Sequence, residues 1–196
     1  CFLKHTGQAE HASIQRAIEA CQKLCRTAPE KIQADIYSTG IAIMFLCELD
    51  ARAHSKEIEV LVRSLIHRQK SVGGWGYASG DHVRDGDTSM TQYAVLGLWT
   101  AKTHGFDVPD EVIARVTNWL IRTQDPSGGW GYQGRDPGTY NRVQQVGVRR
   151  ALVGAGLGSS HMRADLLGVS RAADVREIQG LPPAFQKVVE DNSRRD

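Results

Sequence analysis

The chain of 196 residues is long enough to form one sizeable hydrophobic core or part of a larger domain. Its formal net charge is only +2 and its basic residues are scattered, so the composition does not predict nucleic-acid binding. No apolar run approaches the length of a membrane-spanning helix and no signal peptide is recognisable. We therefore expect no membrane span and take the cytoplasm as the default location.

Along the chain, one kind of predicted helix is apolar on a single face. Its apolar residues recur at the i, i+3, i+4, i+7 spacing of a helix with one side in water. Three such amphipathic helices are predicted, around residues 14–21, 58–69 and 112–123. Pro109 and Asp110 are a good start signal for the third, because proline is tolerated in a first helical turn.

The second kind of predicted helix alternates with the first and is apolar on every side. Such helices are expected over residues 35–49, 90–101 and about 143–155, and a helix of this kind should be buried. Asp87 offers an N-cap side chain to the second of them, and Asp35 aligns with it in the first. No segment has the period-2 alternation of strands, so we predict an all-α fold.

Four cysteines lie in the N-terminal quarter of the chain. Cys21 and Cys25 are one helical turn apart, but no further pair of cysteines or histidines supplies the remaining ligands of a zinc site. We therefore expect reduced, packed thiols rather than a metal.

A nine-residue pattern, Q-x-x-x-G-G-W-G-Y, occurs at residues 69–77 and again at 124–132. Duplication of six fixed positions by chance is remote, so this is an internal repeat. The Gly-Gly-Trp turn lets the backbone double back beneath a large ring, while the glutamine amide can bond helix-terminal groups. We predict a structural motif, rather than an aromatic binding platform, built from Gln69, Gly73 and Trp75 and again from Gln124, Gly128 and Trp130.

Q-x-x-x-G-G-W resembles the QW motif of the prenyltransferase and squalene-oxidase repeat family, and is most similar to uncharacterised bacterial members. The resemblance covers about residues 8–160. It implies an α/α toroid with concentric inner and outer helices, of which residues 1–160 would form about three helix pairs, a partial barrel. Residues 161–196 would be a C-terminal extension or linker. A complete toroid has about twice as many pairs, so the resemblance implies either a missing remainder or self-association.

In such a toroid, the loops that enter the inner helices gather on one rim of the central cavity. Neighbouring carboxylates there can hold a cation, or raise one another's pKa and create an acid. Asp85 and Asp87 are therefore the candidate catalytic residues. The candidate ligand-binding residues of the same rim are Asp81, His82, Tyr93, Asp136 and Tyr140.

The catalytic motifs of the family are incomplete in this chain. Alignment with the D-x-D-D-T motif of squalene–hopene cyclases puts Gly86 at the position of the proton-donating aspartate. Alignment with the zinc ligands of protein prenyltransferases keeps Asp85 but replaces the cysteine by Asp87, and residues 140–148 contain no histidine. Zinc is therefore not expected, and an acidic loop would favour Mg²⁺ or Ca²⁺ if it bound a cation.

Two functions follow from the resemblance. The first is a non-catalytic domain that binds an apolar, isoprenoid-like small molecule or a protein partner. The second is an isoprenoid enzyme, a terpene cyclase or a prenyltransferase, that uses the acidic loop 81–87. Asp87 could equally serve only as a helix cap, as the matching Asp35 suggests. A purely architectural helical repeat is a third alternative.

Overall fold

The computed structural model describes residues 7, 9–32, 34–78, 85–150, 152–156 and 158–159. This part of the chain is mostly helical, as predicted, and carries one small two-stranded sheet. Within these ranges, no helix is both long and apolar enough to cross a bilayer. The predicted extension over 161–196 lies outside the described residues.

Three helices match the predicted amphipathic ones: α2 (Ala12–Leu24), α4 (Ser55–His67) and α6 (Asp110–Arg122). Each has a strong apolar face, and α4 and α6 bury theirs in the core. The apolar face of α2 is less covered, because Ile14 is the one buried residue of this helix. A 3-10 turn, η1 (Pro29–Lys31), follows α2.

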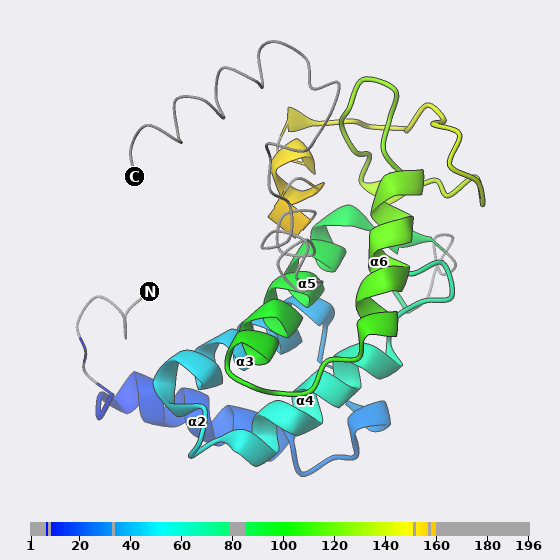
Figure 1. Ribbon diagram of the computed structural model, residues 1–196. Coiled ribbons are helices and arrows are strands. Elements are labelled where there is room, and N and C mark those ends of the chain that lie inside the picture. The colour runs from blue at the N-terminus through cyan, green and yellow to red at the C-terminus, as the bar shows by residue number, and fades with distance from the viewer. Residues whose placement is uncertain are drawn as a thin grey trace, which may run out of the picture.

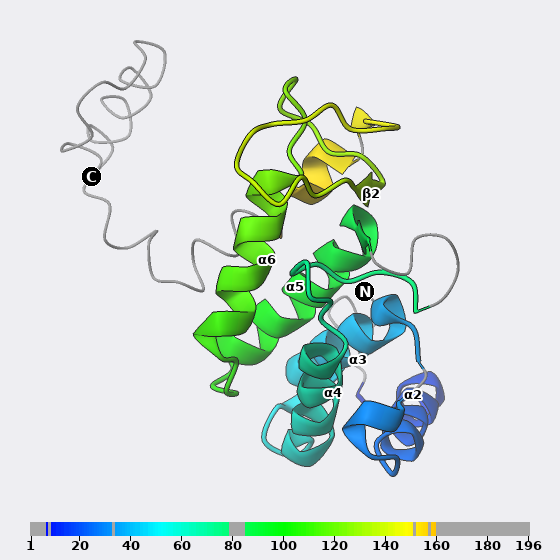
Figure 2. The same cartoon turned by 90° about the vertical axis from the view of Figure 1, so that its right-hand side faces the viewer.

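Two apolar helices, α3 (Ile36–Asp50) and α5 (Thr88–Thr103), lie side by side, with α4 and α6 outside them (Figures 1 and 2). They run in the same direction, since Tyr37 of α3 donates a hydrogen bond to Ser89 Oγ at 2.9 Å while Gly40 lies against Gly97 further along. A Cβ on Gly97 would lie 3.0 Å from the Gly40 Cα. The two glycines therefore allow the backbones to approach closely.

The duplicated pattern forms the same structure twice. In the first copy, the Trp75 indole donates to the Leu65 carbonyl in the last turn of α4 at 2.7 Å. In the second, Trp130 donates to the Leu120 carbonyl in the last turn of α6 at 2.9 Å. The glutamine amides donate to the glycine carbonyls four residues later, Gln69 to Gly73 at 2.8 Å and Gln124 to Gly128 at 3.0 Å. In both copies the glutamine and the tryptophan therefore bond the backbone at the end of the preceding helix and in the glycine turn.

The first copy also reaches the next amphipathic helix. Gln69 Nε2 donates to the Val112 carbonyl in the first turn of α6 at 2.9 Å, and its Oε1 accepts from Arg115. Gly73 packs so tightly on α6 that a Cβ would lie 2.3 Å from the Arg115 carbonyl oxygen. A Cβ on Gly128 of the second copy would meet no described atom within 4 Å. The two turns are therefore alike internally and differ in what covers them.

Two segments depart from the predicted elements. Gly86–Asp87 (β1) pairs antiparallel with Gln133–Gly134 (β2), strands of two residues that are too short to show alternation. The predicted helix over 143–155 is wrong at its start, because helical backbone begins at residue 150. Residues 143–149 instead fold against the second motif, where the Gln145 backbone N–H donates to Asp125 Oδ2 at 2.8 Å and the Gln145 amide bonds both backbone groups of Arg135.

Candidate functional site

The two aligned aspartates are both helix caps. Asp35 accepts from the Ser38 N–H at 2.8 Å at the start of α3, and Asp87 accepts from the Met90 N–H at 2.8 Å at the start of α5. Their surroundings differ, since Asp35 is exposed whereas Asp87 is only 1 % exposed. The shared capping role is thus confirmed, and burial singles out Asp87.

Asp87 is held in place by its neighbours on both sides. It pairs with Gln133 in the small sheet, and its N–H donates to the Trp75 carbonyl at 2.7 Å. Its second carboxyl oxygen, Oδ2, is buried and has no hydrogen-bond partner among the described residues. Burial raises the pKa of Asp87, although the Met90 hydrogen bond and the charge of Lys70 act in the opposite direction.

The two caps should therefore respond oppositely to pH. For Asp87, whose folded pKa is raised, the contribution to stability is largest below the ordinary aspartate pKa and falls as pH rises through the raised value. For Asp35, hydrogen bonding by the Ser38 N–H lowers the folded pKa, so its contribution is present above the ordinary pKa and is lost on acidification. As the pH rises from acid to neutrality, we expect the free energy of unfolding of Asp87→Asn to increase relative to that of wild type. We expect the free energy of unfolding of Asp35→Asn to decrease relative to that of wild type over the same range.

Urea unfolding at several pH values between acid and neutrality measures both differences. The matched Asp35→Asn variant controls for the loss of a capping carboxylate as such. The same direction of change in both variants would show that burial does not distinguish the two caps.

The other rim residues of the sequence prediction are only partly brought together. Asp81 and His82 lie outside the described residues. Asp85 lies near Lys70. Burial lowers the pKa of Lys70, although the charges of Asp85 and Asp87 act in the opposite direction. Tyr93 stacks edge-to-face on Tyr37, with ring centres 5.0 Å apart.

Asp136 and Tyr140 are held on α6 instead. Arg122 donates to both carboxylate oxygens of Asp136 at 2.9 and 2.8 Å, and Tyr140 donates to Asn118 Oδ1 at 3.0 Å. Burial alone would raise the pKa of Asp136, but the Arg122 hydrogen bonds hold it below its ordinary value. Arg122 also donates to the Val72 carbonyl at 3.2 Å, so this ion pair joins the first motif to the loop after the second.

Tyr37 and Lys70 were not predicted as rim residues. The sequence does carry a signal for Tyr37, because Tyr37 follows Asp35 by two positions just as Ser89 follows Asp87. The hydroxyls of Tyr37 and Ser89 are hydrogen-bonded to each other.

Among the described residues, no group of three or more His, Cys, Asp or Glu side chains could hold a metal ion.

A groove of about 830 Å³ opens between α2, α3 and α5. We call it the apolar groove. Its lining is mostly aliphatic and aromatic, and the exceptions are Cys21, Ser38, Glu48 and Thr100. The complete lining is Ala17, Ala20, Cys21, Ser38, Ile41, Ala42, Met44, Phe45, Glu48, Leu96, Trp99 and Thr100.

The apolar groove corrects the expectation that the inner helices are buried all round. Ile41 of α3 is 50 % exposed, and Phe45 and Trp99 are only half-buried. The volume and the mostly apolar walls fall in the range of sites that bind small molecules or hydrophobic segments.

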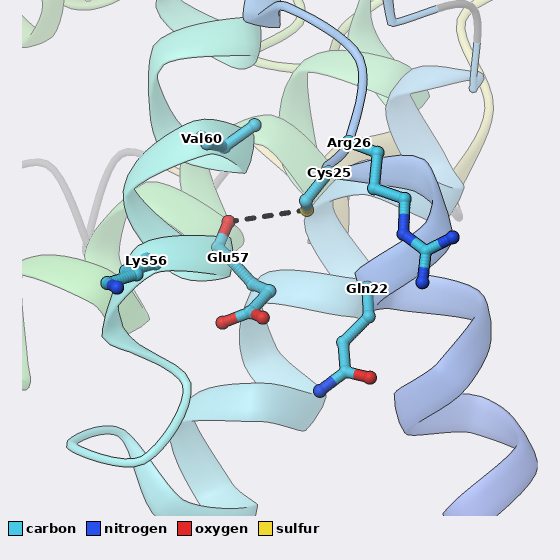
Figure 3. Close-up of a pocket in the computed structure, with 6 residues that line it drawn as sticks. All are labelled: Gln22, Cys25, Arg26, Lys56, Glu57 and Val60. Carbon is cyan, nitrogen blue, oxygen red and sulfur yellow. Dashed lines mark hydrogen bonds between the residues drawn. The ribbon is translucent and has the colours of Figure 1, made fainter.

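A smaller, polar pocket lies between α2 and α4 (Figure 3). Cys25 Sγ donates to the Glu57 carbonyl at 3.6 Å, and burial raises the pKa of Cys25 to about 12. Such a thiol stays protonated and is a poor nucleophile. Cys21, Cys25 and Cys47 are free thiols.

No family model matches the sequence, and neither the curated proteins nor the solved structures contain a significant match.

Proposed function

We propose that the chain is part of an α/α toroid whose apolar groove binds an apolar, isoprenoid-like molecule or the apolar side of a protein partner. Support for the toroid comes from the two Q-x-x-x-G-G-W-G-Y turns, which make matching hydrogen bonds, and from the alternation of amphipathic helices with α3 and α5. Both features are those that gave the resemblance to the prenyltransferase and squalene-oxidase repeat.

The observation that carries the binding function is the apolar groove itself. Apolar surface left in water costs about 25 cal/mol per Å² relative to burial, so a groove lined by Ile41, Phe45 and Trp99 favours any partner that covers it. The few polar groups on its wall would set the orientation of the partner rather than react with it.

Binding of the fluorescent apolar probe 1-anilinonaphthalene-8-sulfonate, and its displacement by farnesol, tests this function. We expect saturable binding by the dilute wild-type protein and at least about tenfold weaker binding by Ile41→Glu, because a carboxylate in the groove must be desolvated. Ile121→Glu is the matched control, since Ile121 is a 43 % exposed isoleucine on α6 outside the groove. Equal loss in both variants, or no saturable binding by wild type, would contradict the proposal.

An isoprenoid enzyme is the second candidate. The observation in its favour is the buried Asp87 carboxyl, whose Oδ2 has no hydrogen-bond partner among the described residues at the start of α5. Incubation with squalene and with prenyl diphosphates, with and without Mg²⁺, tests it. Product that forms with wild type and disappears with Asp87→Asn would favour the enzyme.

A further inference from the structure

We propose that the tyrosines that end the two motifs, Tyr77 and Tyr132, form with Tyr37 a binding site for a methylated ammonium cation. None of these three side chains lines the apolar groove, so the inference concerns a second site and goes beyond the proposed function. Tyr77 and Tyr132 occupy the last position of the repeat, for which the hydrogen bonds of its glutamine and tryptophan give no reason.

The two motif tyrosines are repeated in the sequence but are not buried in the structure. Tyr77 is 49 % exposed and Tyr132 is 39 % exposed, whereas Trp75 and Trp130 of the same turns are buried. A residue that is repeated for packing should be buried, as the tryptophans are. The tyrosines instead leave much of their aromatic surface accessible to a ligand.

The backbone brings both motif tyrosines to the strand β1. The Thr88 N–H donates to the Tyr132 carbonyl at 2.9 Å on one side. On the other side, a Cβ on Gly76, the residue before Tyr77, would lie 3.2 Å from the backbone nitrogen of Asp87. The two copies of the repeat therefore meet at the residue that caps α5.

Tyr37, from the first turn of α3, joins this group. Its hydroxyl donates to Ser89 Oγ at 2.9 Å, and its ring packs edge-to-face on Tyr93. Burial raises the pKa of Tyr37, the hydrogen bond with Ser89 lowers it, and the charges of Asp87 and of both motif tyrosines raise it. Charge effects weaken with distance, so these groups lie close to the Tyr37 hydroxyl. Four of the five tyrosines of the chain thus gather near the start of α5.

The charges at this place favour a cation. Asp87 is only 1 % exposed, and its Oδ2 has no hydrogen-bond partner among the described residues. Burial disfavours the ionised carboxyl, and a positive charge nearby would stabilise it. Lys70 supplies one positive charge, but Asp85 and Asp87 both act on it. Two carboxyl groups therefore share one ammonium group.

The tyrosine rings favour a cation that is methylated. The negative face of an aromatic ring attracts a cation, and aromatic sites recognise quaternary ammonium groups in this way. Because the Asp87 carboxyl is buried, a ligand can respond to its charge without forming a hydrogen bond to it. A quaternary ammonium has no N–H donor to satisfy, whereas an unmethylated lysine ammonium has three.

Isothermal titration calorimetry of the full chain with choline, and with its neutral isostere 3,3-dimethylbutan-1-ol, tests the inference. We expect saturable binding of choline and at least about tenfold weaker binding of the isostere, because the two differ in charge and not in shape. No saturable binding of choline, or equal binding of the two compounds, would overturn the inference.

A peptide that contains trimethyllysine, compared with the same peptide containing lysine, forms the second arm of the experiment. We expect the methylated peptide to bind more tightly than the unmethylated one. The tighter of choline and the methylated peptide then identifies the source of the cation. A preference for the unmethylated peptide would contradict a methyl-ammonium site.

Substitutions of the motif tyrosines locate the site. We expect Tyr77→Leu and Tyr132→Leu each to weaken choline binding about threefold or more, and the corresponding phenylalanine variants to retain it, because they keep the ring. Tyr140→Leu is the matched control, since Tyr140 is a 63 % exposed tyrosine that is hydrogen-bonded to Asn118 of α6. Equal weakening by Tyr140→Leu, or no weakening by either motif variant, would overturn the inference.

Ile41→Glu separates this site from the apolar groove. We expect this variant to bind choline as wild type does, because Ile41 lines the groove and the three tyrosines do not. Loss of the apolar probe with choline binding retained would therefore concern the groove function alone. Loss of choline binding in Ile41→Glu would contradict a separate cation site.

Discussion

Replacing Gly73 by alanine should lower the free energy of unfolding by more than about 3 kcal/mol. Two costs combine at this residue. Its φ of +107° is a conformation that side chains rarely adopt, and the new Cβ would lie 2.3 Å from the Arg115 carbonyl oxygen of α6. Relief would require α6 to move away from the turn, which would also separate Gln69 from Val112. Urea unfolding at neutral pH measures the loss.

Gly128→Ala is the matched control, because Gly128 occupies the same position in the second motif. Its φ of +88° carries a similar conformational cost, but no described atom lies within 4 Å of the added Cβ. We expect a loss of about 1 kcal/mol. Equal losses in the two variants would mean that contact with α6 does not contribute to the difference between the two turns.

Trp75→Ala should cost about 4 kcal/mol, the second large effect. The Trp75 side chain is fully buried between the end of α4 and the start of α5, so its removal leaves a cavity within the main core. The substitution also removes the hydrogen bond from the indole to the Leu65 carbonyl. The decrease in free energy of unfolding can be read from urea or thermal denaturation.

Trp75→Phe separates packing from hydrogen bonding. Phenylalanine retains most of the buried ring surface but has no donor for the Leu65 carbonyl, so a smaller loss of about 1–2 kcal/mol is expected. If Trp75→Phe were as unstable as Trp75→Ala, the stabilisation by Trp75 would come mainly from its hydrogen bond and not from burial of the ring.

The amphipathic helices and the repeated motif could be predicted because their determinants are local. The apolar spacing in α4 and α6 and the six fixed positions of the repeat are visible without any knowledge of distant contacts. The start of the last described helix could not be predicted in this way. Helical backbone begins only at residue 150, because Gln145 donates a hydrogen bond to Asp125 and accepts one from the Arg135 N–H, residues twenty and ten positions away.

The candidate site was predictable to a similar degree. The alignment of Asp35 with Asp87 correctly indicated two helix caps, but it could not show that only one of them is buried, because burial depends on β2 and Trp75. The attachment of Asp136 to Arg122 of α6 likewise depends on a loop path that no periodicity encodes. Exposure of Ile41 is a property of what surrounds α3, so its continuous apolar sequence predicted burial instead.

The hydrogen bond from Gln69 to Val112 of α6 determines when the first motif can become stable during synthesis of the chain. The first motif bonds Val112 and packs Gly73 against Arg115, so it cannot be completed until the ribosome has made a helix that begins more than thirty residues later. The first repeat is thus closed by its successor, as in arrays whose stability is a sum of nearest-neighbour couplings. Nascent chains that stop before α6 should lack a finished first turn, and order should spread from one repeat to the next as translation proceeds.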